Sequence, residues 1–203
     1  MRTLLVLLIL SLFLVAGCVQ SPPTNDVNIE EDIVDDTISA DDIDSIPDVP
    51  DDSNETGPID GGMQAVDGVT SEDVVYFQST TGFLAKPEGE GTYPGVVLIH
   101  EWWGLNDNIK NSAQKLAKEG YVVLAVDLYN GQVASTSSEA QALVGSVDLN
   151  AAIDNMQAAV AYLRTEQNAP KVGSWGWCFG GGKSLQLAVS GEDLDATVLY
   201  YGQ

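Results

Sequence analysis

The residues with the clearest capacity for chemistry lie in the stretch GSWGWCFGGGKS, residues 173–184. Within it, residues 176–180 have the sequence GWCFG, a nucleophilic side chain flanked at two residues on each side by glycine. This spacing suits a sharp turn from a strand into a helix, where the glycines let the two elements approach and leave the nucleophile exposed. The positive end of a helix dipole stabilises a thiolate at that position. The pattern indicates Cys178 as a nucleophile, and a buried structural thiol is the alternative.

The end of this stretch, GGGKS, also invites comparison with a phosphate-binding loop. That loop requires a glycine, four residues of any type, and then Gly-Lys-Ser. Counting back from Lys183 places Trp177 where the first glycine is needed. A bulky side chain there would block the backbone cradle for phosphate, so we discount nucleotide binding.

A second candidate segment is LIHEWWGLNDNI, residues 98–109, which follows an apolar run. An enzyme with a nucleophile on such a turn takes one amide of its oxyanion hole from a loop in this position. Glu101 is expected near the carboxyl edge of the sheet, where ligands bind in open α/β folds. The carboxylate and the thiol are therefore expected at the same edge.

The elements that must position these residues alternate along the chain. Turn signals, apolar runs and helical spacing of apolar residues predict strands at 74–78, 83–86, 95–100, 121–127, 171–177 and 196–202, and helices at 108–119, 137–145, 148–166 and 180–190. The turn of the first strand pair is expected at STTG, and the first helix is expected between a cap at Asp107 and a stop at Gly120. Alternation of strands and helices predicts an α/β fold with a parallel sheet.

The segments HEWWGLN, LAKEGYVVLAVDLY, GWCFGGG and VLYYG together resemble the dienelactone hydrolase family, in register from about Val74 to Gly202. The resemblance implies an α/β-hydrolase-like, mostly parallel sheet with flanking helices, and hydrolysis of ester or lactone bonds in small molecules. It implies that Cys178 is the nucleophile and that Glu101 helps to control its ionisation. The amides of Trp102 and Phe179 would form the oxyanion hole, and neither a metal nor a cofactor is expected.

The sequence departs from the family pattern in two features: the arginine that follows DLY, and the acid and histidine that follow the nucleophile. Members that bind an anionic substrate often carry an arginine soon after DLY, where this chain has Gly131, so the sequence gives no basis for predicting a carboxylate-bearing substrate. In α/β-hydrolases the catalytic acid and histidine follow the nucleophile. The single histidine, His100, precedes Cys178 and is interpreted as structural, while Asp195 is interpreted as a solvated loop residue.

The sequence therefore predicts that the α/β-hydrolase domain is incomplete at its C-terminus, without the Asp and His of the triad. Little or no esterase activity is expected from this polypeptide alone. The alternative is a non-catalytic or degenerate surface lipoprotein that uses the same scaffold for binding.

The N-terminal segment predicts export. Residues 1–18 contain an apolar run of thirteen residues, Leu4 to Ala16, broken only by Ser11. A membrane-spanning helix needs about 20 residues, so the run fits the core of a signal peptide. Its end, VAGC, resembles a lipobox, which would make Cys18 the lipidated N-terminus of a membrane-anchored extracytoplasmic protein. An ordinary cleaved signal that contains a cysteine is the alternative.

Residues 19–65 predict a disordered acidic tether before a domain at residues 66–203. Residues 19–62 hold 14 acidic and no basic side chains, and no aromatic residue, too little apolar area to offset chain entropy. The formal net charge of the whole chain is −22, which excludes a nucleic-acid partner because phosphate binding needs Lys and Arg.

Overall fold

The computed structural model describes residues 62–202. The predicted signal peptide with Cys18, and all of the predicted tether except residues 62–65, lie outside the described residues. The described elements are β1 (Val69–Phe77), β2 (Thr80–Pro87), β3 (Gly95–Ile99), α1 (Asp107–Lys118), β4 (Val122–Val126), α2 (Ser137–Ser146), α3 (Leu149–Thr165), β5 (Val172–Trp177), α4 (Phe179–Val189) and β6 (Ala196–Tyr200). Each predicted strand and helix has a counterpart in this order.

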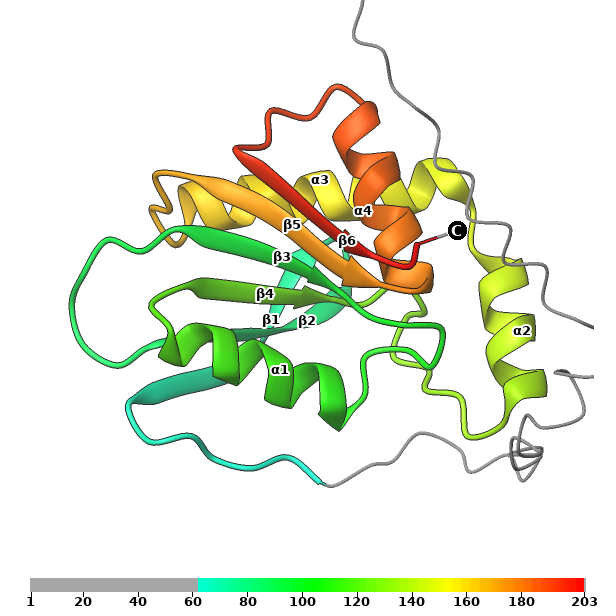
Figure 1. Ribbon diagram of the computed structural model, residues 1–203, viewed down its shortest axis with the longest axis horizontal. Coiled ribbons are helices and arrows are strands. Elements are labelled where there is room, and N and C mark those ends of the chain that lie inside the picture. The colour runs from blue at the N-terminus through cyan, green and yellow to red at the C-terminus, as the bar shows by residue number, and fades with distance from the viewer. Residues whose placement is uncertain (1–61, 203) are drawn as a thin grey trace, which may run out of the picture. The chain divides into compact units, whose positions relative to one another are not determined.

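The six strands form one sheet in the order β1-β2-β4-β3-β5-β6 (Figure 1). The four strands β4, β3, β5 and β6 run parallel, and the hairpin β1–β2 joins them antiparallel through the pairing of β2 with β4. Parallel neighbours require crossover connections, which the helices supply. The arrangement confirms the predicted α/β fold with a mostly parallel sheet and flanking helices.

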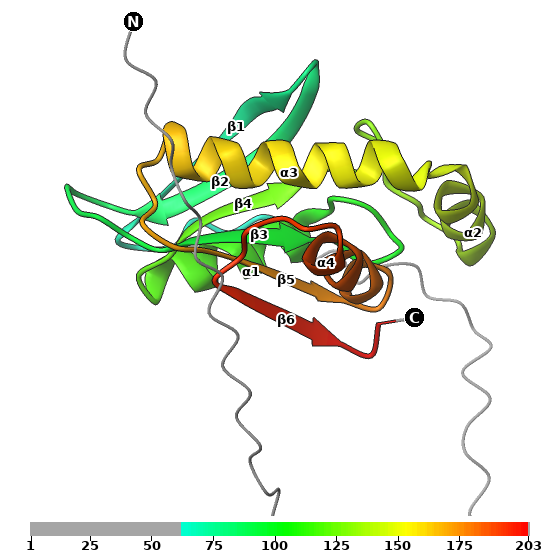
Figure 2. The same ribbon diagram turned by 90° about the horizontal axis from the view of Figure 1, so that it is seen from above.

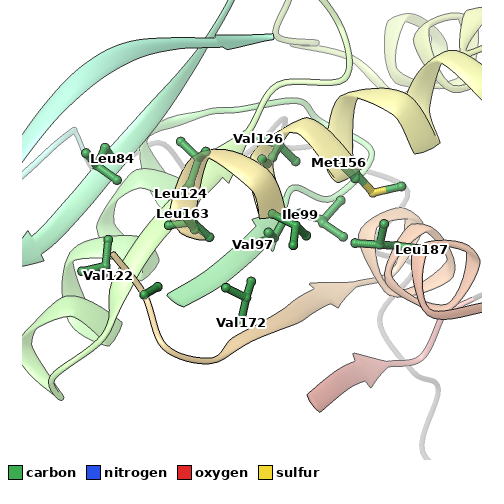
Figure 3. Packing of buried hydrophobic residues seen from close by; sticks show 13 residues of the cluster. Leu84, Val97, Ile99, Val122, Leu124, Val126, Met156, Leu163, Val172 and Leu187 are labelled. Atoms are coloured by element: carbon green, nitrogen blue, oxygen red, sulfur yellow. The ribbon is translucent and has the colours of Figure 1, made fainter. Parts of the chain in front are cut away.

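Helices cover both faces of the sheet. Figure 2 shows α3 and α4 on one face and α1 on the other. The central strands are apolar throughout because alternate side chains enter two separate cores. In β3, Val97 and Ile99 pack with α3 and α4, whereas Val96 and Leu98 pack with α1. Figure 3 shows how β3, β4, α3 and α4 fill the first of these cores, around Val97, Ile99, Met156 and Leu187.

Two local predictions were wrong in detail. The hairpin turn is at Gln78 and Ser79, not at a glycine-containing STTG turn; Gly82 lies inside β2. A Cβ on Gly82 would lie 2.8 Å from the carbonyl oxygen of Ala125, so this glycine permits the close approach of β4. Helix α1 is capped by Asn106, whose Oδ1 accepts a hydrogen bond from the Ile109 amide at 3.2 Å, and not by Asp107. The predicted stop at Gly120 is confirmed by its φ of +94°.

The two ends of the described chain differ in their contacts. Residues 62–64, which the sequence assigned to the tether, hydrogen-bond to the side chain of Asn111 in α1. Strand β6 pairs with β5 along one edge, and Val198, Leu199 and Tyr200 in it are each more than one third exposed. Within residues 62–202, none of the helices combines the length and the apolar character needed to cross a bilayer.

Candidate active site

Cys178 occupies the apex of a strand-to-helix turn. It is the single residue between β5 and α4, and its backbone has φ 53° and ψ −121°. A positive φ is strained for a side chain with a Cβ and persists only where surrounding structure enforces it. Here the Cys178 amide donates to the carbonyl of Tyr200 at 3.1 Å, and the Cys178 carbonyl accepts from the Gly182 amide at 3.1 Å. The side chain is half-buried, so it is neither enclosed in a core nor fully in solvent.

The glycines on either side of this turn are required by backbone contacts. A Cβ on Gly176 would lie 2.2 Å from the Gly180 carbonyl oxygen, and a Cβ on Gly180 would lie 2.4 Å from that of Ile99. Real Cβ atoms do not approach backbone oxygens so closely. The contact between Gly176 and Gly180 brings α4 close to the end of β5, as the GWCFG spacing predicted, and the first turn of α4 also packs directly against the end of β3.

Glu101 reaches the same edge of the sheet as Cys178. Strand β3 pairs in parallel with β5, with Ile99 opposite Gly176. Glu101 and Cys178 each lie two residues beyond that pair, so the register brings both to the carboxyl ends of adjacent strands. The Glu101 side chain is half-buried, and its Oε1 accepts a hydrogen bond from the hydroxyl of Tyr201 at 3.2 Å.

The hydroxyl of Tyr201, which contacts Glu101, has a raised pKa. Desolvation raises the pKa of its hydroxyl, and the negative charges of Glu101 and Cys178 raise it further. The Tyr201 hydroxyl therefore stays protonated and donates to the Glu101 carboxylate. The backbone of Tyr201 also has a positive φ, of 35°, just after β6 ends.

His100 is fully buried between the ends of β3 and β4. Its Nδ1 lies 2.6 Å from the carbonyl oxygen of Glu101, and its Nε2 accepts a hydrogen bond from the Leu128 amide at 3.2 Å. These contacts place the proton on Nδ1, because a carbonyl oxygen can only accept. Burial lowers the pKa of His100, against smaller opposing effects of the Glu101 carbonyl and the charge of Asp127. The ring is neutral, and both nitrogens are occupied by backbone groups.

The turn after β4 is organised by Asp127. Its Oδ1 accepts from the Tyr129 amide at 2.8 Å, and its Oδ2 accepts from the Gly131 amide. This local bonding holds the ring of Tyr129 against His100 and Phe179, at centroid distances of 4.6 and 5.5 Å. The rings of His100, Tyr129 and Phe179 thus form a cluster that adjoins Glu101 and Cys178 in the sequence.

A model of the dienelactone hydrolase family matches residues 80–203. The chain belongs to the dienelactone hydrolase family. Protein usf from Aquifex pyrophilus is 38% identical over 130 residues, which cover 60% of this chain and 55% of that protein. Carboxymethylenebutenolidase from Pseudomonas putida is 28% identical over 137 residues, which cover 63% of this chain and 58% of that protein.

Solved structures agree with this assignment. The structure of m3DLH superposes with a TM-score of 0.60 at 30% identity, over 66% of this chain and 59% of that one. A dienelactone hydrolase-like promiscuous phosphotriesterase from metagenomic libraries gives a TM-score of 0.57 at 34% identity, over 66% of this chain and 60% of that one. The chain spans somewhat more than half the length of these relatives.

The sequence predicted the strand-to-helix turn at Cys178, called the elbow from here on, and the loop that begins at Glu101. It missed the tyrosines that lie near these two residues in this family member. Tyr129 and Tyr201 lie within the DLY and VLYYG segments, which were used only as marks of resemblance. Asp195 was interpreted as a solvated loop residue; it is exposed, but its carboxylate accepts from the Val172 amide at 2.8 Å. That contact is at the amino end of β5, the opposite end from Cys178. The oxyanion roles of the Trp102 and Phe179 amides stay predictions, although Phe179 as first residue of α4 has no carbonyl partner in its own helix.

A cavity of about 360 Å³ adjoins the Asp127 turn, and neither Cys178 nor Glu101 lines it. It is bordered by polar side chains that include Asp148, Asp154 and Asn155. Within residues 62–202, His, Cys, Asp and Glu side chains form no cluster of three or more that could hold a metal ion.

Replacing Gly180 with alanine should destabilise the domain, because the new Cβ would collide with the carbonyls of Ile99 and His100. We expect the free energy of unfolding to fall by about 3 kcal/mol or more, measured by urea denaturation. Gly145→Ala in α2 is the matched control, since a Cβ there meets nothing within 4 Å. That variant should gain about 0.5–1 kcal/mol from helix propensity. Equal effects of the two substitutions would contradict the close packing of the elbow.

Acidification should destabilise the folded domain through His100. The unfolded chain takes up a proton near pH 6.5, whereas the buried ring resists it, so stability is complete above that pH and is lost as the pH falls below it. Urea unfolding between pH 7.5 and 5 should show a slope of up to about 1.4 kcal/mol per pH unit from this group. His100→Gln removes the titrating group while the carboxylates remain. Parallel pH profiles of the two proteins would rule out this origin.

Proposed function

We propose that this protein hydrolyses carboxylic ester or lactone bonds with Cys178 as its nucleophile. The main observation in support of this proposal is the elbow. Cys178 lies with a positive φ between β5 and α4, at the carboxyl edge of the sheet, where Glu101 also lies. Nucleophiles on such turns present the reactive atom to a substrate lying above the sheet. Membership of the dienelactone hydrolase family supports this choice over other thiol chemistry.

In the proposed reaction the Cys178 thiolate attacks the carbonyl carbon and forms a carbon–sulfur bond. The carbonyl electron pair moves to its oxygen, and the resulting oxyanion is held by the amides of Trp102 and Phe179. Collapse of this intermediate restores the carbonyl and breaks the bond to the alcohol oxygen. The alkoxide leaves and takes up a proton, and an acyl-thioester of Cys178 remains. Water then releases the acid and regenerates the thiol.

Glu101 is the candidate for control of the thiol proton. It follows β3 as Cys178 follows β5, and its carboxylate is held by the Tyr201 hydroxyl. In this proposal the carboxylate accepts the proton when the thiolate forms. His100 is not assigned a proton-transfer role, because its two nitrogens are bound to the Glu101 carbonyl and the Leu128 amide.

The relatives narrow the substrate only to a class. One is a carboxymethylenebutenolidase and another is described as a promiscuous phosphotriesterase. This chain covers about 60% of each of them, so the activity of the whole protein is a proposal. No arginine lies between Asp127 and Ala134 to bind a substrate carboxylate, so an uncharged ester or lactone is the proposed substrate.

Cys178 of the 203-residue chain should be acylated faster than the acyl group is released, because the single histidine is hydrogen-bonded to backbone groups through both ring nitrogens. With p-nitrophenyl acetate we expect a burst of about one equivalent of p-nitrophenolate per protein, followed by slow release. Mass spectrometry should locate the acetyl group on the peptide that contains Cys178. Cys178→Ala should remove both burst and adduct, while Ser190→Ala should keep them. A folded protein that forms no adduct would favour the alternative of a scaffold used only for binding.

We further propose that the enzyme is anchored to a membrane through lipid on Cys18, on the extracytoplasmic side. The support is the apolar run of residues 4–16 followed by VAGC, and the acidic segment that would separate the domain from the bilayer. In bacterial cells supplied with an alkyne fatty acid, the protein should be labelled and sediment with membranes. Cys18→Ser should abolish labelling, and Cys178→Ser, which leaves the other cysteine, should not. Labelling that persists in Cys18→Ser would exclude this anchor.

A further inference from the structure

Tyr129 is a buried residue of the turn after β4, with 3% of its surface exposed. Its ring packs against the rings of His100, which precedes Glu101, and Phe179, which follows Cys178, and those two rings also stack on each other at 5.7 Å. The Asp127 carboxylate fixes its backbone through the Tyr129 amide at 2.8 Å. The ring and the backbone of Tyr129 are therefore both fixed, in contact with residues that adjoin the two predicted site residues in the sequence.

The hydroxyl of Tyr129 has no hydrogen-bond partner. In the described part of the chain, three buried side-chain polar atoms share this property: Gln114 Oε1, Tyr129 Oη and Trp175 Nε1. Leaving a buried polar group without a hydrogen bond costs about 1–3 kcal/mol of folding free energy, so its presence in a folded protein calls for an explanation. Of the three, only Tyr129 belongs to a segment that packs on the residues flanking Cys178.

The hydroxyl is also within the electrostatic reach of the sulfur. Burial raises the pKa of Tyr129, and the charge of Cys178 raises it further. The phenol is thus protonated at neutral pH and can act as a hydrogen-bond donor. It offers a neutral donor that no other described group uses.

We propose that Tyr129 Oη donates a hydrogen bond to the thiolate of Cys178 when the sulfur turns toward it. The thiol gives up its proton, and the anionic sulfur then becomes the acceptor that the buried hydroxyl lacks. Tyr129 acts as a positioning and stabilising donor for the reactive form of the nucleophile. This inference rests on the proposed function, because it assumes that Cys178 works as a thiolate.

The other polar groups at this edge of the sheet already have partners. The Tyr201 hydroxyl is engaged with the Glu101 carboxylate, and the neutral His100 ring is bound to the Glu101 carbonyl and the Leu128 amide. Lys183 on α4 directs its ammonium over the Phe179 ring at 5.1 Å and donates to Gln186. Tyr129 is therefore the free neutral donor among the groups named here.

The test is the pH dependence of alkylation of the 203-residue chain by iodoacetamide, followed by mass spectrometry at Cys178. Tyr129→Phe keeps the ring and its packing and removes only the hydroxyl. The midpoint of the rate profile should rise by about one unit, so alkylation below both midpoints slows roughly tenfold. The plateau rate at high pH should be equal or higher, because a less stabilised thiolate is more nucleophilic. Tyr121→Phe, at the exposed opposite end of β4, should leave the profile unchanged.

The outcomes separate the two proposals. A Cys178 that resists alkylation at every pH in the unsubstituted protein would overturn both the thiolate mechanism and the role of Tyr129. A reactive Cys178 whose midpoint is the same in Tyr129→Phe, with circular dichroism confirming the fold, would overturn the role of Tyr129 alone. A purely structural tyrosine would change the unfolding midpoint without moving the alkylation profile.

Discussion

The site depends on one steric constraint, the contact of the first turn of α4 with the end of β3. Gly180 faces the carbonyl oxygens of Ile99 and His100, and a Cβ would lie 2.4 and 2.6 Å from them. Because glycine allows this approach, the helix begins immediately after the strand and Cys178 is forced into a positive φ. The same contact brings the thiol beside the loop that starts at Glu101. Strain at Cys178 and proximity to the carboxylate therefore have a common cause.

The buried imidazole of His100 links the ends of β3 and β4 to the beginning of α4. It joins the Glu101 carbonyl after β3 to the Leu128 amide after β4, and it stacks at 5.7 Å on Phe179 at the beginning of α4. A neutral ring serves this purpose because one nitrogen donates while the other accepts. Histidine is the residue type most often used for proton transfer, but both ring nitrogens of His100 are hydrogen-bonded to backbone groups. Proton transfer in the proposed reaction therefore needs other groups.

Local patterns in the sequence predicted the elbow and the parallel sheet. GWCFG specifies a turn within five residues, and the apolar runs of β3 and β4 indicate burial on both faces. The contact of Tyr201 with Glu101 was not predictable, since it joins residues one hundred positions apart and depends on the β5–β6 register. The cap of α1 was misplaced because Asn106 and Asp107 are both good capping residues, and only the backbone geometry selects between them.

The charges at this edge explain why neutral donors gather there. In the proposed reaction, a thiolate that has given its proton to Glu101 is followed by an oxyanion close to the sulfur, and the Lys183 ammonium is turned to Phe179 and Gln186. Tyrosine hydroxyls and backbone amides lower the energy of an anion without adding a counter-charge that would hold the carboxylate or a substrate too tightly. Both tyrosines have a raised pKa, so they remain donors throughout the reaction. An edge built in this way suits an uncharged substrate that becomes anionic only in the transition state.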